Sequence, residues 1–386
     1  MKLTTLTHHL NPERNSGPVP GWSTPIPVEM NSERTLALVF GSSRYFDEPE
    51  GIAQLRAGLS SAHLIGCSTS GEIVGDEVFD DSLTVAIARF DHTRLAGARA
   101  TIDSAADARA AGRALGDQLA GPELKSVLVL SDGLRVNGSE LVRGLNERLG
   151  SGVVVTGGLA GDGDRFERTW VIDEGVPTSG VISAVGFYGD RIRVGHGSRG
   201  GWDIFGPQRR VTRSEGNVLF ELDGQPALKL YREYLGERAE GLPATGLLFP
   251  LALRSDEEPD KQLVRTILAI DPQTESLTFA GDIPEGSRAQ LMKANFDRLV
   301  EGAADAAALT TNGSHDGPTL AVAISCVGRR LVLGERTEDE IEATLEALPE
   351  GTRQVGFYSY GELSPYASGT CDLHNQTMTL TTFTEL

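Results

Sequence analysis

A short apolar run that breaks into a polar, glycine-containing turn occurs three times in this chain of 386 residues. The three copies lie at 64–73 (LIGCSTSGEI), 154–163 (VVTGGLAGDG) and 354–363 (QVGFYSYGEL). In each copy a strand and a helix are predicted before the turn, a glycine and an acid lie in it, and another strand follows after roughly ten to fifteen residues. The recurrence indicates one supersecondary unit that is used three times.

Hydrophobic spacing along the rest of the chain predicts alternating strands and helices, which is typical of an α/β protein. Strands are expected at 35–40, 63–67, 82–90, 126–130, 152–156, 169–173, 181–188, 320–326, 354–358 and 376–383, and helices at 51–59, 105–119, 139–149, 226–235, 289–308 and 338–348. The stretches 263–270 and 276–280 predict an antiparallel hairpin, and 212–220 predicts a strand and the start of a helix.

We therefore expect an α/β protein of two parts, built from repeated β-α-β-β units, with a distinct α+β insert in the C-terminal part. Residues 1–34 are expected to form an irregular N-terminal arm, because 11–32 is rich in Pro, Gly, Asn and Ser. Residues 35–195 would form a domain of two units, and 196–386 would form a second domain that holds the third unit.

Charge and composition limit the classes of function. The formal net charge of −19 argues against nucleic acid as a partner, because no basic stripe is available to neutralise phosphates. No apolar run reaches the ~18 to 20 residues of a membrane span, and residues 1–30 lack the apolar region of a secretion signal. Cys67, Cys326 and Cys371 are widely spaced, which suits reduced thiols, so a cytoplasmic location is expected.

The three turns are the expected ligand contacts. Glycine lets a ligand approach the backbone, and the side chains of Ser68, Thr69 and Ser70 in the first turn can orient it through hydrogen bonds. Gly158 is the corresponding close-approach position in the second turn. The alternative is that glycines after strands only make tight turns.

Charged residues suggest how a zwitterion would be held. Arg265 is a lone cation in an apolar strand and could take a carboxylate in bidentate fashion; alternatively, it lies on the solvent face of an edge strand. Glu72, Asp162 and Glu362 occupy matching places in the three turns and could receive an ammonium group. Alternatively, these carboxylates cap turns or helix N-termini.

Two histidines are candidates for an iron ligand if haem binds. His374 follows the third turn beside Asn375 and near Tyr360, and its alternative role is a hydrogen-bonded histidine at a strand start. His196 is the second candidate, since Gly195 and Gly197 on either side would admit a flat macrocycle. A C-x-x-C-H motif is absent from the sequence, which excludes covalent haem attachment.

An enzyme is the competing class of function. Cys67 or Ser68 could serve as the nucleophile of a hydrolase or transferase at a strand-to-turn junction. The sequence lacks the G-x-S-x-G form of a nucleophile elbow, a P-loop and a G-x-G-x-x-G motif. We therefore expect a protein without catalytic activity.

Several motifs taken together resemble the FIST family, whose members pair a FIST N-terminal and a FIST C-terminal domain, across nearly the whole chain. They are GCSTSGE (66–72), GGLAGD (157–162), GNVLFELDGQPA (216–227), FAGDIPEG (279–286), FYSYGE (357–362) and HNQT (374–377). Under this resemblance the predicted domains are FIST N-terminal-like over 35–195 and FIST C-terminal-like over 196–386.

The resemblance implies a sensory module that binds a small ligand, amino acids among them, and signals to kinases, cyclases or chemoreceptors. Some relatives resemble haem-binding nitric-oxide sensors that act on a histidine kinase, which is the alternative function. No fused output domain is recognisable, so a signal to a partner in trans is expected. The ligand is expected in a cleft between the two parts, lined by the turn residues together with Arg265, Tyr360, His374 and Asn375.

Overall fold

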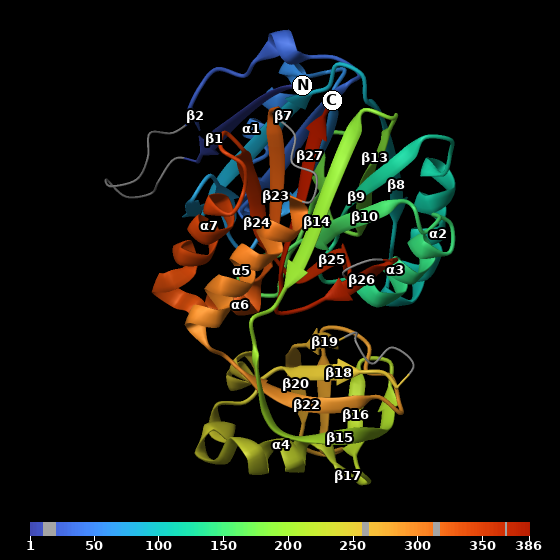
Figure 1. The fold of residues 1–386 in the computed structure, drawn as a ribbon, viewed down its shortest axis with the longest axis vertical. Helices are drawn as coiled ribbons and strands as arrows, with labels where there is room; N and C mark the ends of the chain where they lie inside the picture. Colours follow the sequence, from blue (N-terminus) through green and yellow to red (C-terminus); the bar gives the residue numbers. More distant parts are fainter. Residues whose placement is uncertain (11–20, 257–261, 312–316, 367–368) are drawn as a thin grey trace.

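The computed structural model describes residues 1–10, 21–256, 262–311, 317–366 and 369–386. Three copies of one unit form a body, and a smaller insert lies at one end of it (Figure 1). The first unit contains β3 (Thr35–Gly41), α1 (Glu50–Gly58), β4 (His63–Ser68), β5 (Glu72–Val74), β6 (Glu77–Phe79) and β7 (Ser82–Arg89). The second contains β9 (Leu124–Ser131), α3 (Gly138–Asn146), β10 (Val154–Leu159), β11 (Val171–Asp173), β12 (Val176–Thr178) and β13 (Val181–Tyr188). The third contains β23 (Thr319–Cys326), α7 (Thr337–Glu346), β24 (Arg353–Ser359), β25 (Gly361–Pro365), β26 (Cys371–His374) and β27 (Met378–Glu385).

All three units share one strand pairing. The first strand pairs in parallel with the strand that follows the crossover helix and antiparallel with the last strand of the unit. A further strand pairs with each last strand: β1 (Lys2–His9) with β7, β8 (Arg94–Thr101) with β13, and β14 (Ile192–Arg199) with β27. β2 (Gly21–Trp22) extends β1.

The hairpins exchange between units in a cycle. β5 pairs with β24 of the third unit, β25 pairs with β10 of the second, and β11 pairs with β4 of the first. Each sheet of the body therefore contains strands from two units. Because one strand of every hairpin pairs with a strand of a neighbouring unit, the three units are expected to fold as one cooperative body.

The core of the body lies between the three sheets. Their inner faces contribute a single apolar cluster, in which Phe40 stacks on Phe357 and Phe187 stacks on Phe383. The outer faces are covered by α1, by α2 (Ala108–Leu119) with α3, and by α5 (Phe296–Thr310) with α7 (Figure 1). This layering confirms the predicted α/β class with repeated units.

The insert separates β14 from the rest of the third unit and has its own apolar core. It contains β15 (Asp203–Glu215), β16 (Val218–Leu222), β17 (Gln225–Pro226), α4 (Ala227–Leu235), β18 (Leu251–Arg254), β19 (Gln262–Arg265), β20 (Ile267–Asp271), β21 (Ser276–Phe279) and β22 (Arg288–Lys293). β20 and β21 form the predicted hairpin. After β22 the chain returns through α5 to β23, which begins the body part of the third unit (Figure 1).

Three predicted elements were wrong. Residues 2–9 of the expected irregular arm form β1, because they pair with β7 along its whole length, and residues 11–20 lie outside the described part. The stretch 212–220 forms parts of two strands and contains no helix. The helix expected at 289–308 is a strand to Lys293 and a helix from Phe296, because Asn295 caps it by accepting a hydrogen bond from the N–H of Arg298. The predicted boundary at 195/196 falls within β14, and the domain division stays a prediction.

In each unit, one residue of the second parallel strand is a glycine at which a Cβ would meet the carbonyl oxygen of its partner in the first strand. A Cβ placed on Gly157, whose φ is +150°, would lie 1.8 Å from the carbonyl oxygen of Val129, its partner in β9. Gly66 and Gly356 meet the same restriction in the other two units. We expect Gly157→Ala to lower the free energy of unfolding by at least ~1–3 kcal/mol in urea denaturation, because the strands must separate. Gly152→Ala, where a Cβ meets open space, is the control, and equal midpoints for the two variants would contradict this pairing.

Candidate functional site

The three turns meet at the end of the body that faces the insert. The Ser70 N–H donates to the carbonyl oxygen of Tyr358 at 2.8 Å, and its hydroxyl accepts from the Gly163 N–H at 3.0 Å. The Tyr360 hydroxyl donates to the Asp162 carboxylate and accepts from the Asp162 N–H at 3.2 Å. The structure therefore brings together Ser70, Asp162 and Tyr360, one from each unit.

Asp162 organises its own loop. Its carboxylate accepts hydrogen bonds from the backbone N–H groups of Phe166, Glu167 and Arg168 at 2.8–2.9 Å. Burial alone would raise the pKa of Asp162, but these hydrogen bonds and that of Tyr360 hold it below its usual value. The loop also stacks the Phe166 ring on Tyr360, with centroids 4.5 Å apart.

Glu72 and Glu362 lie inside the protein and are equivalent to each other. Glu72 accepts hydrogen bonds from the Thr69 hydroxyl and from the N–H and hydroxyl of Ser82. Glu362 accepts from the Ser359 hydroxyl and from the N–H and hydroxyl of Thr377. Because both are almost fully buried and engaged, neither is placed to receive a ligand ammonium group.

Asp162 does not share the position of these two acids. Glu72 and Glu362 lie on the exchanged hairpin strands, opposite Phe357 of β24 and Gly158 of β10. The exchanged strand of the second unit instead places Val171 opposite Cys67. The predicted equivalence therefore holds for two of the three acids, because the second unit has a longer loop before its hairpin.

The other predicted turn contacts are also internal. Ser68 is fully buried and its hydroxyl accepts from the Trp170 N–H at 3.0 Å, while Thr69 is engaged with Glu72. Gly158 packs against the side chains of the core. Burial also raises the pKa of the Cys67 thiol. A hydrolase or transferase that uses Cys67 or Ser68 is thus not supported, because a substrate cannot reach either side chain.

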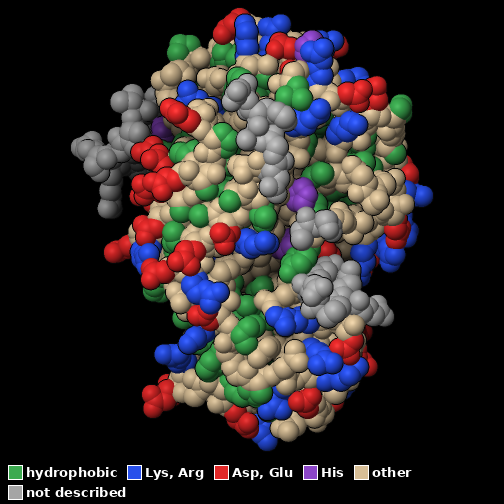
Figure 2. Space-filling model, viewed as in Figure 1, with side chains coloured by type: hydrophobic (Ala, Val, Ile, Leu, Met, Phe, Trp, Pro, Cys, Tyr) green, Lys and Arg blue, Asp and Glu red, His purple; other side chains and the backbone are tan. Residues whose placement is uncertain are grey.

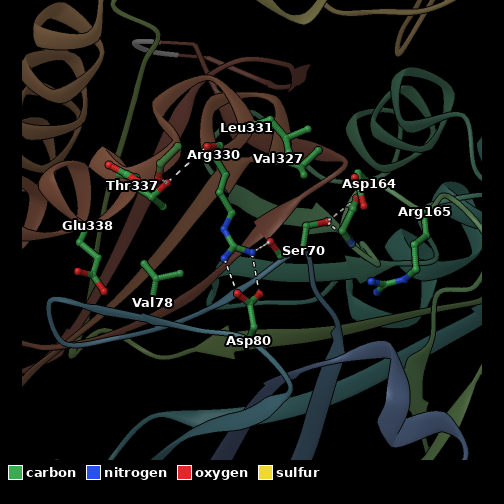
Figure 3. Close-up of a pocket in the computed structure, with 13 residues that line it drawn as sticks. Ser70, Val78, Asp80, Asp164, Arg165, Val327, Arg330, Leu331, Thr337 and Glu338 are labelled. Atoms are coloured by element: carbon green, nitrogen blue, oxygen red, sulfur yellow. Dashed lines mark hydrogen bonds and ion pairs between the residues drawn. The ribbon is translucent and has the colours of Figure 1, made fainter. Parts of the chain in front are cut away.

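A hollow of about 550 Å³ opens beside the junction of the turns (Figure 3). One wall is the first turn and its hairpin, another is the loop after Asp162, and the third is α6 (Val327–Leu333) with the start of α7. The lining residues are Ser70, Val78, Asp80, Gly163, Asp164, Arg165, Val327, Arg330, Leu331, Gly334, Glu335, Thr337 and Glu338. All three units contribute to it, and both predicted parts of the chain are represented.

Arg330 crosses this hollow from α6 to the first unit (Figure 3). Its guanidinium makes two hydrogen bonds to the Asp80 carboxylate, at 2.8 and 2.7 Å, and one to the carbonyl oxygen of Ser70 at 2.6 Å. Gly71 has φ +129°, which other residues rarely adopt, and a Cβ there would lie 2.5 Å from the guanidinium. Arg330 was not predicted from the sequence, because it lies in a short helix outside every motif. What marks it is its contact with the GCSTSGE turn, which is seen only in the folded structure.

Arg265, His374 and Asn375 do not line the hollow. The Arg265 guanidinium is buried and donates to the backbone carbonyl oxygens of Asp282, Val264 and Leu373 at 3.0–3.1 Å. Arg265 therefore joins the insert to β26, rather than lying on a solvent-exposed edge. The single predicted site divides into a hollow at the turns and a second group of residues where the insert meets the body.

The surroundings of the two histidines do not fit haem. His374 is buried, and its Nε2 lies 2.9 Å from the carbonyl oxygen of Ser364, so this nitrogen is already engaged. Gly195 and Gly197 face α5 instead of leaving room for a macrocycle beside His196: a Cβ on either would lie 2.2 or 2.0 Å from carbonyl oxygens of that helix. We assign no haem chemistry to this chain.

Within the described ranges, His, Cys, Asp and Glu side chains do not gather in groups of three or more that could hold a metal ion. Among the helices of the same ranges, each is too short or too polar to cross a bilayer.

Comparison with known proteins identifies the family. A FIST N domain matches residues 35–225 and a FIST C domain matches residues 227–365. An uncharacterized protein of Mycobacterium tuberculosis strain H37Rv is 27% identical over 367 residues, covering 91% of each chain. An uncharacterized protein of Methanocaldococcus jannaschii is 27% identical over 239 residues, covering 54% of this chain and 45% of its own. A solved cyanuric acid hydrolase from A. caulinodans aligns over 91% of this chain and 89% of its own, but with a TM-score of 0.32 and 9% identity it carries no inference.

The two domain matches follow one another and together span most of the body and the insert. This chain belongs to the FIST family, whose domains are sensory.

Proposed function

We propose that this protein senses a small polar ligand in the hollow at the turns and signals in trans to a partner protein. The observation that carries the proposal is that one hollow is built from all three units. A ligand that contacts both the first turn and α6 would stabilise the arrangement of these two elements that allows both contacts, relative to any other arrangement. Such a differential interaction is what a ligand-driven switch requires.

The charges of the hollow favour a ligand that carries an ammonium group. Four carboxylates line it, from Asp80, Asp164, Glu335 and Glu338, against the two guanidinium groups of Arg165 and Arg330. A ligand carboxylate could take the place of Asp80 on Arg330, since guanidinium groups bind carboxylates in bidentate fashion. Amino acids combine both groups and are the ligand class that we propose.

The output is proposed to pass to a separate signalling protein, of which a histidine kinase is one candidate. The protein would act without catalysis and without nucleic acid, for which its net charge of −19 is unsuited. A cytoplasmic location is part of the proposal. It is supported by the three cysteines, which are buried and form no disulfide bond.

Replacing Arg330 by alanine tests the hollow. We expect wild-type protein to bind at least one of the twenty standard amino acids in isothermal titration calorimetry. Arg330→Ala should weaken that binding by about 1.5–3 kcal/mol, or roughly 10- to 150-fold, because a charge-assisted hydrogen-bond donor is lost.

Arg213→Ala is the matched control, because Arg213 forms an exposed ion pair with Glu221 at 3.2 Å in the insert, away from the hollow. This variant should bind as the wild type does. Equal affinities in all three proteins, or no heat from any amino acid, would remove the hollow as the amino-acid site.

A further inference from the structure

The insert meets the body along a seam, defined here by the turn that joins β26 to β27 and by the insert residues that contact it. Figure 1 shows β19 and β18 of the insert next to β26 of the body, and the molecule narrows there in Figure 2. Three hydrogen bonds mark the seam. Arg265 Nη1 donates to the Leu373 carbonyl oxygen at 3.1 Å, Gln376 Nε2 donates to Leu247 at 3.4 Å, and Trp202 Nε1 donates to the Gln376 carbonyl oxygen at 2.8 Å.

Buried polar atoms without partners are concentrated at this seam. Both amide atoms of Asn375 and Oε1 of Gln376 are buried and make no hydrogen bond. These are three of the seven such side-chain atoms among the described residues. Buried polar groups in folded proteins nearly always have a partner, so such a concentration requires an explanation.

Arg265 adds a buried charge to the same place. Only about 4% of the residue is exposed. Among the described residues no carboxylate forms an ion pair with it, although those of Asp282 and Asp372 act on its charge from a greater distance. Its guanidinium donates hydrogen bonds from Nε and Nη1 to backbone carbonyl oxygens. Nη2 is therefore available to a further acceptor. Buried guanidinium groups are normally paired with an anion.

We propose that the seam encloses a second ligand, a small molecule that has a carboxylate or carboxamide oxygen and at least one N–H donor. Its oxygen would accept from Nη2 of Arg265 and Nδ2 of Asn375, and its N–H would donate to Oδ1 of Asn375 and Oε1 of Gln376. Asn375 lies two residues after Leu373, whose carbonyl oxygen accepts from Arg265. This site shares no residue with the hollow.

The two sites lie on different sides of α6. A Cβ on Gly328 would lie 2.4 Å from the carboxamide of Gln376, whereas Arg330 and Leu331 line the hollow. The last turn of α6 packs against the insert through Val332 and Leu333. A ligand in the seam would therefore fix the insert against the helix that carries Arg330.

Burial also predicts how the ligand behaves. Asn375 is 1% exposed, so a molecule held by it is surrounded by protein and leaves only when the seam opens. We expect it to remain bound during purification of the full chain. Acid denaturation followed by mass spectrometry should then release a small carboxylate or carboxamide in an amount comparable to that of the protein.

Asn375→Leu is the discriminating variant. It keeps the branched shape and the number of side-chain heavy atoms while it removes two unpartnered polar atoms, so the unliganded protein should melt at the same temperature as the wild type or higher, while the released molecule is lost. Thr156→Val is the matched control, because it removes an equally buried and unpartnered hydroxyl in β10 and should leave the release unchanged. Arg330→Ala should also release the molecule, which separates this site from the hollow. If Asn375→Leu fails to fold, Gln376→Met, which removes the Oε1 acceptor assigned to the ligand, provides the same comparison of the released molecule.

Added ligands complete the test. Wild-type protein is unfolded in urea, dialysed to remove the released molecule, refolded, and heated with glutamine, glycine, acetamide or acetate; at least one of the first three should raise the melting temperature by a few degrees. Asn375→Leu should show no such rise. If the wild type releases nothing and responds to none of the four, ordered water alone fills the seam and the proposal is overturned. A rise that persists in Asn375→Leu would equally exclude this site.

Discussion

Replacing Arg329 by methionine is expected to lower the free energy of unfolding by about 3–5 kcal/mol, because the Glu340 carboxylate would be left buried without a counter-charge. Both side chains are fully buried, and Nη2 of Arg329 lies 2.7 Å from Oε2 of Glu340. A buried pair of this kind is weak evidence for net stability, yet removal of one partner is strongly destabilising.

The pair also joins parts of the chain that are distant in sequence. Arg329 donates to carbonyl oxygens of Leu299 in α5 and of Gly200, which precedes the insert. Glu340, in α7, accepts from the hydroxyl groups of Ser325 and Tyr358. Loss of Arg329 therefore leaves several buried acceptors unpaired at once, which places its effect above that of an ordinary core substitution.

Urea denaturation measures the loss in free energy of unfolding, and two further variants show where it comes from. Arg329→Met with Glu340→Leu should recover most of the loss, because neither charge then remains buried. Arg336→Ala breaks exposed ion pairs with Asp297 and Asp339 and should cost far less, because solvent screens charges at the surface. A cost for Arg329→Met no greater than that of Arg336→Ala would show that the buried charge is compensated by other means.

The repeated unit could be predicted from sequence because its signals are local. Apolar runs such as 320–326 and 354–358 are fully buried strands. A run of this kind is visible within a few consecutive residues, so a strand can be predicted without knowledge of its neighbours. The three polar turns were recognised for the same reason. Their side chains define the ends of strands whether or not a ligand is bound.

The candidate site could be predicted only in part, because its contacts join distant residues. Ser70 and Arg330 are 260 positions apart, and no spacing pattern links a turn to a short helix in another unit. Likewise, β5 pairs with β24 because the hairpins are exchanged between units. Neither strand has a sequence feature that predicts this partner. Arg265 was recognised as an unusual cation, but the carbonyl oxygens that hold it come from the folded seam.

Glu72 and Glu362 are expected to make the protein less stable as the pH rises from about 5 to 8. Burial raises the pKa of each to about 8 in the folded protein, from an ordinary value of 4.5, although the surrounding hydrogen bonds act in the opposite direction. Below pH 4.5 both states hold the proton, and between 4.5 and 8 only the folded state does. The free energy of unfolding should therefore fall by about 1.4 kcal/mol per pH unit for each residue across this window, and level off above pH 8.

The environment of these acids explains why the folded protein keeps the proton. Neither carboxyl forms an ion pair with a described residue, and each has a hydroxyl, Thr69 or Ser359, that can reverse its hydrogen bond and accept from the protonated acid. The double variant Glu72→Gln, Glu362→Gln holds hydrogen at both places at every pH. Its free energy of unfolding is measured by urea denaturation at intervals from pH 5 to 8 and should not show the decrease attributed to the two acids. The difference in free energy of unfolding between this variant and the wild type should therefore change steadily with pH.

Glu147→Gln separates this effect from general titration of surface acids. Hydrogen bonds from Arg113 and Arg109 lower the pKa of Glu147 to about 2, so its own contribution changes only below pH 4.5. Its curve should run parallel to that of the wild type from pH 5 to 8. If the curve of the double glutamine variant is parallel as well, Glu72 and Glu362 are ionised in the folded protein, and their hydrogen bonds from Ser82 and Thr377 outweigh burial.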